Sequence, residues 1–447
     1  MLFWGALFML KRKIEENMDA WLRGNKSLLV EGARQVGKTF LIREFCKKNF
    51  ENYFEINLLE RKDAVNALSK VNNAKDLLLV LSSFSDVSFV PGKTVIFIDE
   101  IQEAKELDVV TMSKFLVEEG SYRFIFSGSL LGVELDNTKS WPVGYMEIIK
   151  MFPLDFEEFL WANKVNDDVI REARNSFFER RRVLEPIHDK LLDYYYKYLI
   201  VGGMPEAVNE FVNSNDLKRV SHVQNMINTM YKKDVGKYSK LQEKLHLEQV
   251  YNLIPEELNS KSKRFSLGKI GSVYQTRKIT DDFVWLTNAG VGIPVYNVSE
   301  PVVPLVISVN RRLLKLFLSD VGILTNCLMD TEIRTKLLSR EKSINYGAVF
   351  ENACAQELLC HGFEEIFYYN SKKNGEVDFL ITYKGKVVPL EIKSGKDYEK
   401  HSALTNLLSN ENYEIDEAFV FCNDNYKISG KIHYFPVYML SFLERNR

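Results

Sequence analysis

The amino-acid sequence predicts an α/β fold whose first part is a parallel sheet with helices on both faces. Three observations predict it: a glycine-rich loop joins an apolar run to a helical pattern, a second apolar run ends in two acids, and apolar runs alternate with helical patterns from about Lys11 to Leu160. We place this part at residues 1–162, and the remaining length allows about two further domains. The candidate strands are Ser27–Glu31, Tyr53–Asn57, Thr94–Asp99, Arg123–Ser127 and Met146–Met151.

The glycine-rich loop fits the pattern G-x-x-x-x-G-K-[ST] at every required position. Its glycines let the backbone wrap around an anion, so that consecutive N–H groups point at phosphates. Lys38 then contacts the β- and γ-phosphates, and the Thr39 hydroxyl ligates Mg²⁺. The loop therefore predicts a binding site for a nucleoside triphosphate. Its members are Gly32, Ala33, Arg34, Gln35, Val36, Gly37, Lys38 and Thr39.

The second apolar run, Val95–Ile98, leads directly into Asp99 and Glu100. Ligands of a parallel sheet lie outside the carboxyl ends of its strands, so the loop and Asp99 should converge there. Asp99 would hold Mg²⁺, and Glu100 would polarise the attacking water as the catalytic base. The doubled acid favours ATP hydrolysis over a GTPase switch. Ser127, or Ser129 beyond it, is a candidate sensor of the γ-phosphate, although a serine after a strand is also typical of a plain turn.

The composition is that of an ordinary globular protein, with 46% apolar and 27% charged residues. A formal net charge of −2 excludes a uniformly basic nucleic-acid binder, so DNA contact would need a local patch. The five cysteines show no C-x-x-C spacing, which predicts reduced thiols in a cytoplasmic protein. The apolar stretch Met1–Leu10 is too short to span a bilayer and lacks the flanks of a signal peptide, so no membrane partner is expected.

Residues 163–342 predict a helical region that ends in a winged helix. The tyrosines at 194–198 could stack on bases, but packing between helices is the better interpretation. Between Tyr231 and Trp285, eleven Lys and Arg stand against seven Asp and Glu. Two short helices followed by two extended segments are typical of a DNA reader, and also of a protein–protein module. These elements are Phe265–Gly271, Thr276–Phe283, Val291–Val298 and Val302–Ser308.

Residues 343–447 carry a separate pattern, a helix followed by two candidate strands. Glu376–Ile381 and Val387–Lys393 read as strands, and Lys384–Lys386 reads as the hairpin turn between them. Side chains alternate along a strand, so two charged residues of the second strand share one face. If the strands pair, an acid of the first strand reaches the same face.

The residues in question are Asp378 on the first strand and Glu391 and Lys393 on the second. Together with Glu351, which opens the preceding helical pattern, they are the parts of a metal-dependent phosphodiester hydrolase. Asp378 and Glu391 would hold Mg²⁺, Lys393 would stabilise or activate the nucleophilic water, and Glu351 would complete the metal shell. The alternative is a surface Glu–Lys pair on an edge strand.

With these motifs in order, the chain resembles a family of bacterial and archaeal AAA-type P-loop ATPases that carry a C-terminal domain of unknown function. The resemblance spans nearly the whole chain. It implies an ATPase core that uses ATP and Mg²⁺, a helical and winged-helix middle, and a restriction-endonuclease-like tail. The motifs that carry it are Gly32–Thr39, Ile98–Gln102, Ser127–Ser129, Pro153–Phe159, Gly202–Glu206, Lys315–Leu324, Phe350–Asn352, Glu376–Asp378 and Glu391–Lys393.

One position departs from the family pattern, because Tyr145 stands where the family usually has an arginine. The arginine finger is therefore unassigned. Two interpretations remain open. In the first, ATP drives action on double-stranded DNA through the winged helix and the nuclease-like tail. In the second, nucleotide state switches protein contacts, homo-oligomer assembly among them, and the tail is inactive.

Overall fold

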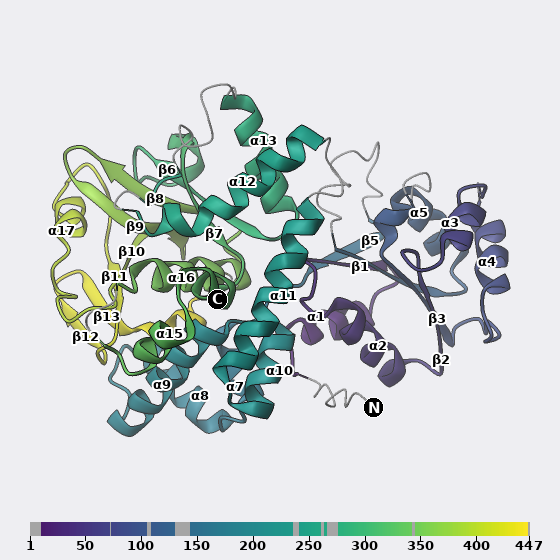
Figure 1. Ribbon diagram of the computed structural model, residues 1–447, viewed down its shortest axis with the longest axis horizontal. Helices are drawn as coiled ribbons and strands as arrows, with labels where there is room; N and C mark the ends of the chain where they lie inside the picture. The colour runs from purple at the N-terminus through teal and green to yellow at the C-terminus, as the bar shows by residue number, and fades with distance from the viewer. Residues whose placement is uncertain are drawn as a thin grey trace. The chain divides into compact units, whose positions relative to one another are not determined.

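The computed structural model describes residues 10–71, 73–104, 109–129, 144–235, 241–260, 263–265, 276–341 and 345–445 (Figure 1). These residues form two compact units. The first unit is Arg12–Phe152 with Asn288–Gly290, and the second is Pro153–Thr287 with Val291–Arg447. In the described parts of the chain, no helix has the length and apolar character needed to cross a membrane. The five cysteines are free thiols, as predicted.

The first unit is built on a five-stranded sheet in the order β2-β3-β4-β1-β5, and every pair of neighbouring strands is parallel. All five predicted strands are present, and the predicted parallel sheet is confirmed. The elements are α1 (Ile14–Trp21), β1 (Ser27–Glu31), α2 (Lys38–Asn49), β2 (Asn52–Asn57), α3 (Lys62–Leu68), α4 (Ala74–Ser83), β3 (Thr94–Asp99), the 3₁₀ turn η1 (Ile101–Glu103), α5 (Val109–Glu119), β4 (Arg123–Gly128) and β5 (Met146–Lys150).

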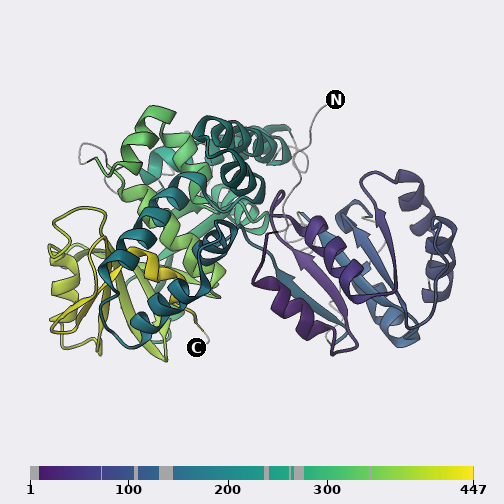
Figure 2. The same ribbon diagram turned by 90° about the horizontal axis from the view of Figure 1, so that it is seen from below.

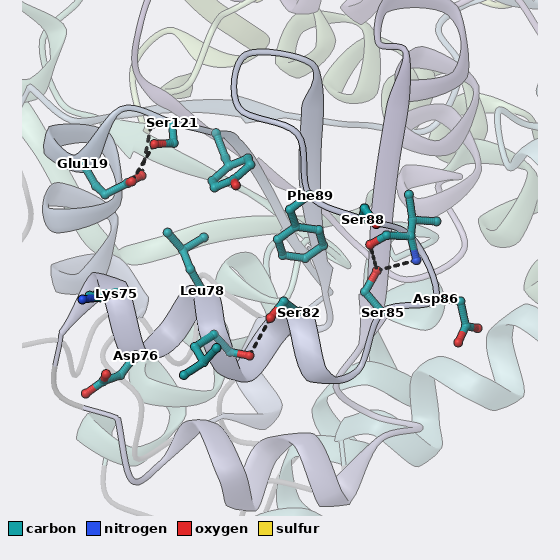
Figure 3. A pocket seen from close by; sticks show the side chains of 13 residues that line it. Lys75, Asp76, Leu78, Ser82, Ser85, Asp86, Ser88, Phe89, Glu119 and Ser121 are labelled. Atoms are coloured by element: carbon teal, nitrogen blue, oxygen red, sulfur yellow. Dashed lines mark hydrogen bonds between the residues drawn. The ribbon is translucent and has the colours of Figure 1, made fainter.

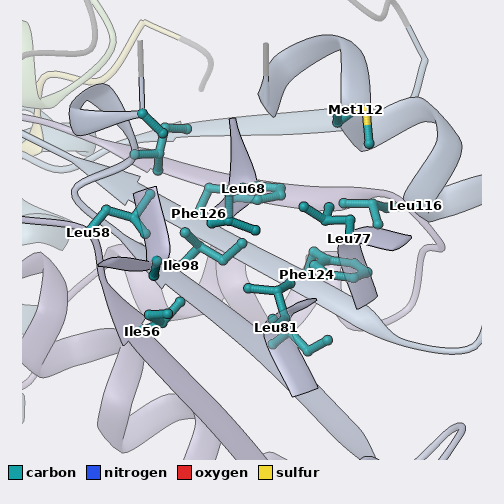
Figure 4. Packing of buried hydrophobic residues seen from close by; sticks show 14 of the residues in the cluster. Ile56, Leu58, Leu68, Leu77, Leu81, Ile98, Met112, Leu116, Phe124 and Phe126 are labelled. Carbon is teal, nitrogen blue, oxygen red and sulfur yellow. The ribbon is translucent and has the colours of Figure 1, made fainter. Parts of the chain in front are cut away.

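Helices cover both faces of this sheet, because the apolar residues of each strand alternate between two cores. On one face, residues such as Ile98 and Phe124 pack against α3, α4 and α5 (Figure 4). On the other face lie α1 and α2 (Figure 1), whose Trp21 and Phe45 rings are 6.2 Å apart. The strands β3 and β4 are buried nearly throughout, as expected for a sheet covered on both sides.

The second unit contains an eight-stranded mixed sheet in the order β12-β13-β11-β10-β9-β8-β6-β7. The last strands of this sheet along the chain are drawn in yellow in Figure 2. Its strands are β6 (Gly292–Val298), β7 (Val309–Leu318), β8 (Ile366–Ser371), β9 (Gly375–Tyr383), β10 (Lys386–Ile392), β11 (Ala418–Cys422), β12 (Lys427–Ser429) and β13 (Ile432–Pro436). Its helices are α7 (Phe156–Ala162), α8 (Asp167–Phe178), α9 (Glu185–Val201), α10 (Pro205–Ser214), α11 (Leu217–Val235), α12 (Leu241–Leu258), α13 (Thr276–Asn288), α14 (Val321–Leu328), α15 (Thr331–Leu338), α16 (Gly347–Cys360) and α17 (Ser402–Leu408), with the 3₁₀ turns η3 (Leu305–Ser308) and η4 (Val437–Phe442).

The predicted hairpin of the tail is confirmed. The strands β9 and β10 pair antiparallel, with Leu390 opposite Phe379. The two residues between them, Lys384 and Gly385, both have left-handed backbones, with φ of 49° and 78°. Two left-handed residues in a row define the tight turn whose twist matches that of the paired strands.

The predicted wing needs correction. The segment 302–308 is not a strand: it ends in η3, and β7 begins only at Val309. Pro304 has no N–H to donate to a ladder, which explains why this apolar stretch does not pair. The hairpin of β6 and β7 also does not stand apart, because β6 pairs with β8 of the tail. The sheet therefore crosses the predicted boundary at residue 342. Of the two helices predicted before it, Thr276–Phe283 lies within α13, and 266–271 lie outside the described residues.

Several motifs of the sequence resemblance interlock inside the second unit. The Gly203 N–H donates to Oδ2 of Asp320 at 2.6 Å, and the Leu154 N–H donates to the Gly203 carbonyl at 2.7 Å. A Cβ at Gly203 would lie 2.0 Å from the Leu154 carbonyl oxygen, so only glycine fits. Tyr195 and Tyr198 pack on Phe156 and are fully buried. These tyrosines pack between helices and are not free to stack on bases.

Candidate phosphate and carboxylate–lysine sites

The phosphate-binding loop connects β1 to α2 and has the backbone that such a loop needs. Gly32, Gln35 and Gly37 all have positive φ, at 153°, 65° and 95°. A Cβ at Gly32 would lie 2.2 Å from the Met151 carbonyl oxygen, so this position requires glycine. Left-handed positions within such a loop let neighbouring N–H groups turn toward one point, where an anion can bind.

Lys38 is the first residue of α2, and its side chain folds back over the loop. The residue is 7% exposed, and its Nζ donates to the carbonyl oxygens of Gly32 at 2.9 Å and Ala33 at 2.8 Å. Burial lowers the pKa of Lys38 to about 8, although the charges of Glu100 and Asp99 oppose that shift. The loop thus holds an ammonium group that burial disfavours and that no adjacent carboxylate fully compensates.

Asp99 lies at the end of β3 and gathers three polar side chains. The Thr39 hydroxyl donates to its Oδ2 at 2.9 Å, the Asn57 amide donates to the same oxygen at 3.0 Å, and the Ser127 hydroxyl donates to Oδ1. Burial raises the pKa of Asp99, while the bonds from Ser127 and Thr39 act to lower it. A carboxylate beside a hydroxyl is the oxygen donor set that Mg²⁺ prefers, so these residues fit the predicted ion.

Glu100 follows in a left-handed backbone, with φ of 55° and ψ of 48°. Its Oε2 accepts a hydrogen bond from the Ser129 hydroxyl at 3.1 Å and another from the Gln102 amide. The Arg34 Nε donates to the same serine hydroxyl at 3.3 Å. The two candidate sensor serines therefore donate hydrogen bonds to different acids: Ser127 to Asp99 and Ser129 to Glu100. Their role as γ-phosphate sensors stays a prediction.

Two residues of this site were not singled out from the sequence. Asn57 ends β2 directly opposite Asp99 in the parallel register, a relation that only the strand order reveals. Gln102 lies two residues beyond Glu100 and could have been found from that spacing. Tyr145, at the place of the family arginine, donates its hydroxyl to Glu118 at 2.9 Å. The Tyr145 hydroxyl thus already has a hydrogen-bond partner.

The second candidate site is a set of charged side chains in the second unit, here called the carboxylate–lysine cluster. They come from α16, three strands, the residue after β10 and the segment after α12. The pairing of β9 with β10, which the sequence predicts, brings Asp378, Glu391 and Lys393 together. The cluster consists of Asp378, Glu391, Lys393, Glu351, Glu376, Lys263 and Lys315.

The predicted trio converges. The Nζ of Lys393 lies 3.1 Å from Oε2 of Glu391, and the Ile392 N–H donates to Oδ2 of Asp378 at 2.9 Å. Burial acts to raise the pKa of Asp378, but the charges of three lysines together lower it. Burial and the neighbouring Asp378 raise the pKa of Glu391 well above its usual range. A proton or a cation is therefore favoured between these two carboxyl groups.

Lys263 and Lys315 were missed by sequence reasoning, because they lie far from the tail strands along the chain. Lys315 is fully buried on β7, with its Nζ 2.8 Å from Oε1 of Glu376 and 3.8 Å from Oε2 of Glu351. Lys263 forms an ion pair with Oε1 of Glu351. Burial acts to lower the pKa of each lysine, but the charge of Glu351 contributes to a net rise.

Within the described ranges, no group of three or more His, Cys, Asp or Glu side chains is placed to hold a metal ion. In the carboxylate–lysine cluster, lysines lie among the acids. Glu351, Asp378 and Glu391 are therefore brought together as predicted, but their role as metal ligands stays a prediction.

The first unit also has an open cavity of about 840 Å³ beside α4 (Figure 3). None of the described residues of the phosphate-binding loop lines it, so it is separate from the nucleotide site. The lining residues are Lys75, Asp76, Leu78, Leu79, Ser82, Ser85, Asp86, Val87, Ser88, Phe89, Glu119, Ser121 and Tyr122.

Three family models match this chain in succession. Residues 24–160 match a model described as an AAA domain. Residues 192–334 match a domain of unknown function (DUF8612), and residues 346–440 match another (DUF4143). The order is the one that the sequence resemblance implies. Lys263 and Lys315 lie in the second match, whereas the carboxylates of the cluster lie in the third.

An uncharacterized protein of Methanocaldococcus jannaschii, MJ1544, is 23% identical over 392 residues, which cover 82% of this chain and 75% of that protein. Among solved structures, a Walker-type ATPase of Pyrococcus abyssi aligns with a TM-score of 0.44 and 15% identity, covering 72% of this chain and 96% of that one. Drosophila ORC bound to DNA aligns with a TM-score of 0.27 and 15% identity, covering 73% and 95%. At these TM-scores the likeness says nothing about what this chain binds.

Proposed function

We propose that this chain, which carries an AAA-type P-loop ATPase domain followed by two domains of unknown function, binds Mg²⁺–ATP at Gly32–Thr39 and hydrolyses it. The observation that carries the proposal is the hydrogen bond of 2.9 Å between the Thr39 hydroxyl and Asp99. That bond links the phosphate-binding loop to the acidic strand end, beside the buried Lys38.

Each residue of the site has a distinct role in this proposal. Lys38 leaves the two loop carbonyls and binds phosphate oxygens, and the loop N–H groups bind the rest of the phosphate chain. Thr39 and Asp99 would hold Mg²⁺, which would supply positive charge beside the phosphates. Glu100 orients the attacking water and accepts its proton. Gln102 and Ser129 hold the Glu100 carboxylate in place through its Oε2.

Calorimetric titration of Mg²⁺–ATP into the wild type and Lys38→Ala tests the binding step. Loss of a charge-assisted phosphate contact should cost on the order of 2–3 kcal/mol. The matched control is Arg43→Ala on the same helix, whose exposed side chain pairs with Glu55 at 2.6 Å and should not matter. Equal affinity of Lys38→Ala and the wild type would contradict the proposal.

A second candidate function concerns the tail, and the convergence of Asp378, Glu391 and Lys393 favours it. In this function Asp378 and Glu391 hold a divalent cation with Glu351, Lys393 activates water, and the tail cleaves double-stranded DNA. The alternative keeps the tail inactive and makes the chain a nucleotide-controlled switch.

Plasmid nicking with Mn²⁺ separates these two functions, with Asp378→Ala as the control. Nicking that depends on Asp378 supports the hydrolase, and no nicking above the control supports the switch. DNA affinity should also fall steeply with salt if a phosphate-contacting surface exists.

A further inference from the structure

Lys263 is placed in the carboxylate–lysine cluster by the backbone that follows α12. Its N–H donates to the carbonyl and hydroxyl oxygens of Ser260 at 3.3 and 3.2 Å, and its φ is 49°. Phe265, two residues on, donates its N–H to the Leu314 carbonyl at 3.0 Å and packs on Phe283 with ring centroids 5.0 Å apart. A lysine in the left-handed region is uncommon, so the local fold directs this ammonium group toward Glu351.

The charges of the cluster show what Lys263 does there. Four carboxyl groups face three lysines, of which Lys315 is fully buried on β7 and Lys393 pairs with Glu391. Lys263 pairs with Glu351 instead, and its side chain is 27% exposed, whereas the side chain of Lys315 is fully buried. Without its ammonium group, two lysines would remain beside the four carboxyl groups, and a bound cation could supply the positive charge that the cluster loses.

A second observation points to a ligand at the same place. Oε2 of Glu351 is buried and accepts no hydrogen bond from the described residues, and Lys315 Nζ lies 3.8 Å from it. The residue itself is 2% exposed. A buried carboxylate oxygen without a donor is costly, so the site favours a cation closer than Lys315.

We propose that Lys263 is a tethered cation that competes with a divalent metal ion for Glu351, so that the cluster binds metal once the Lys263 ammonium group withdraws. This inference rests on the metal-binding role of the tail in the second candidate function. Mg²⁺ and Mn²⁺ bind carboxylate oxygens, and the Lys263 ammonium group already pairs with Oε1 of Glu351, so a metal ion that uses this oxygen must displace it. Lys263 lies in the domain before the tail, so that domain controls metal access to the tail.

The test is a Mn²⁺ titration of the full chain by calorimetry, without nucleotide, for the wild type and Lys263→Ala. Asp378→Asn identifies the Mn²⁺ site that depends on the cluster, because binding at that site should be lost in this variant. Mn²⁺ binding at the phosphate site should persist in Asp378→Asn, so it can be left out of the comparison. The Asp378-dependent site should bind Mn²⁺ at least about tenfold more tightly in Lys263→Ala, equivalent to about 1.4 kcal/mol. Arg264→Ala is the matched control for loss of a neighbouring positive charge and should behave as the wild type. Lys263→Gln keeps the side-chain length and repeats the test if the alanine variant does not fold.

Two results would overturn the inference in different ways. Equal Mn²⁺ affinity of the Asp378-dependent site in the wild type and both Lys263 variants removes the competition but leaves the metal site. Absence of any Asp378-dependent Mn²⁺ binding in all variants removes the metal site, and with it both the inference and the second candidate function.

Discussion

The two sites each contain a buried lysine, and the protein treats the two in opposite ways. Lys38 donates to two backbone carbonyls, and burial lowers its pKa to about 8. Lys315 lies among carboxylates, and their charges outweigh burial so that its pKa rises. In the phosphate-binding loop, neutral carbonyl oxygens are thus the hydrogen-bond partners of Lys38, and an incoming anion can replace them. The carboxylate–lysine cluster already holds lysines among its carboxyl groups, so we expect a metal ion to enter only when a lysine moves.

The largest effect on stability should come from Lys315→Met. Removing this ammonium group leaves the half-buried Glu376 without its ion-pair partner and the buried Glu351 with the Lys263 pair, and loss of one partner of a buried pair typically costs about 3–5 kcal/mol. Urea denaturation of the second unit measures it. Lys386→Met is the control, because its pair with Asp416 is exposed and screened by solvent, so its loss should change the stability little. A loss no larger than that of the control would mean that the cluster carboxyl groups are already protonated.

The next largest effect should be on catalysis, in Glu100→Gln. The variant keeps the shape of the side chain but removes the base, so ATP should bind normally and turn over at least about 100-fold more slowly. Steady-state phosphate release measures the rate, and calorimetry measures the binding. Glu103→Gln is the matched control, since this acid pairs with Lys62 at 2.7 Å outside the site. Unchanged phosphate release in Glu100→Gln would remove Glu100 from the mechanism.

The two sites also differ in how far the sequence predicts them. The phosphate site could be predicted because its main residues lie in two short runs, each fixed by one loop or one strand end. The strand pairing of Asp378 with Glu391 and Lys393 followed from alternation and a tight turn. Lys263 and Lys315 could not be found in this way, because they reach the cluster only through the packing of α12 and the pairing of β6 with β8.

The segment 302–308, for which the sequence predicts an extended conformation, is not a strand in the structure. Its apolar residues suggest a strand, and Val302 and Ile307 are nevertheless exposed at 49% and 80%. The two prolines that flank Val302 and Val303 interrupt hydrogen bonding, so composition alone misleads there. The same proline signal, weighted more heavily, would have placed the start of the strand near Val309.

Asp320 is a buried carboxylate outside both sites, and the pH dependence of its contribution to stability extends the comparison. Asp320 accepts the Gly203 and Ile323 N–H groups, and burial raises its pKa to about 6, although those bonds oppose the shift. Because the folded pKa lies above the ordinary value of 3.8, its contribution to stability is complete below about pH 3.8 and is lost as the pH rises through 6. The loss should be roughly 1–3 kcal/mol.

Urea denaturation of the wild type and Asp320→Asn at intervals from pH 4 to pH 7 measures this contribution. The difference in free energy of unfolding between the two proteins should shrink as the pH rises across that window, because only the wild type titrates there. A difference that stays constant with pH would show that Asp320 is ionised throughout, as a carboxylate held by backbone N–H groups alone can be.

The smallest effect should come from Lys38→Met, measured as stability in the absence of nucleotide. Burial already disfavours the Lys38 charge, so the uncharged methionine relieves that cost while it loses the two hydrogen bonds to Gly32 and Ala33. These changes oppose each other, and the free energy of unfolding of the first unit should stay within about 1 kcal/mol of the wild type. A lysine-to-methionine substitution should therefore destabilise the second unit at Lys315 and leave the stability of the first unit nearly unchanged at Lys38. If Lys38→Met instead destabilises the first unit as much as Lys315→Met destabilises the second, Lys38 is a structural lysine, and the contrast between the two sites is wrong.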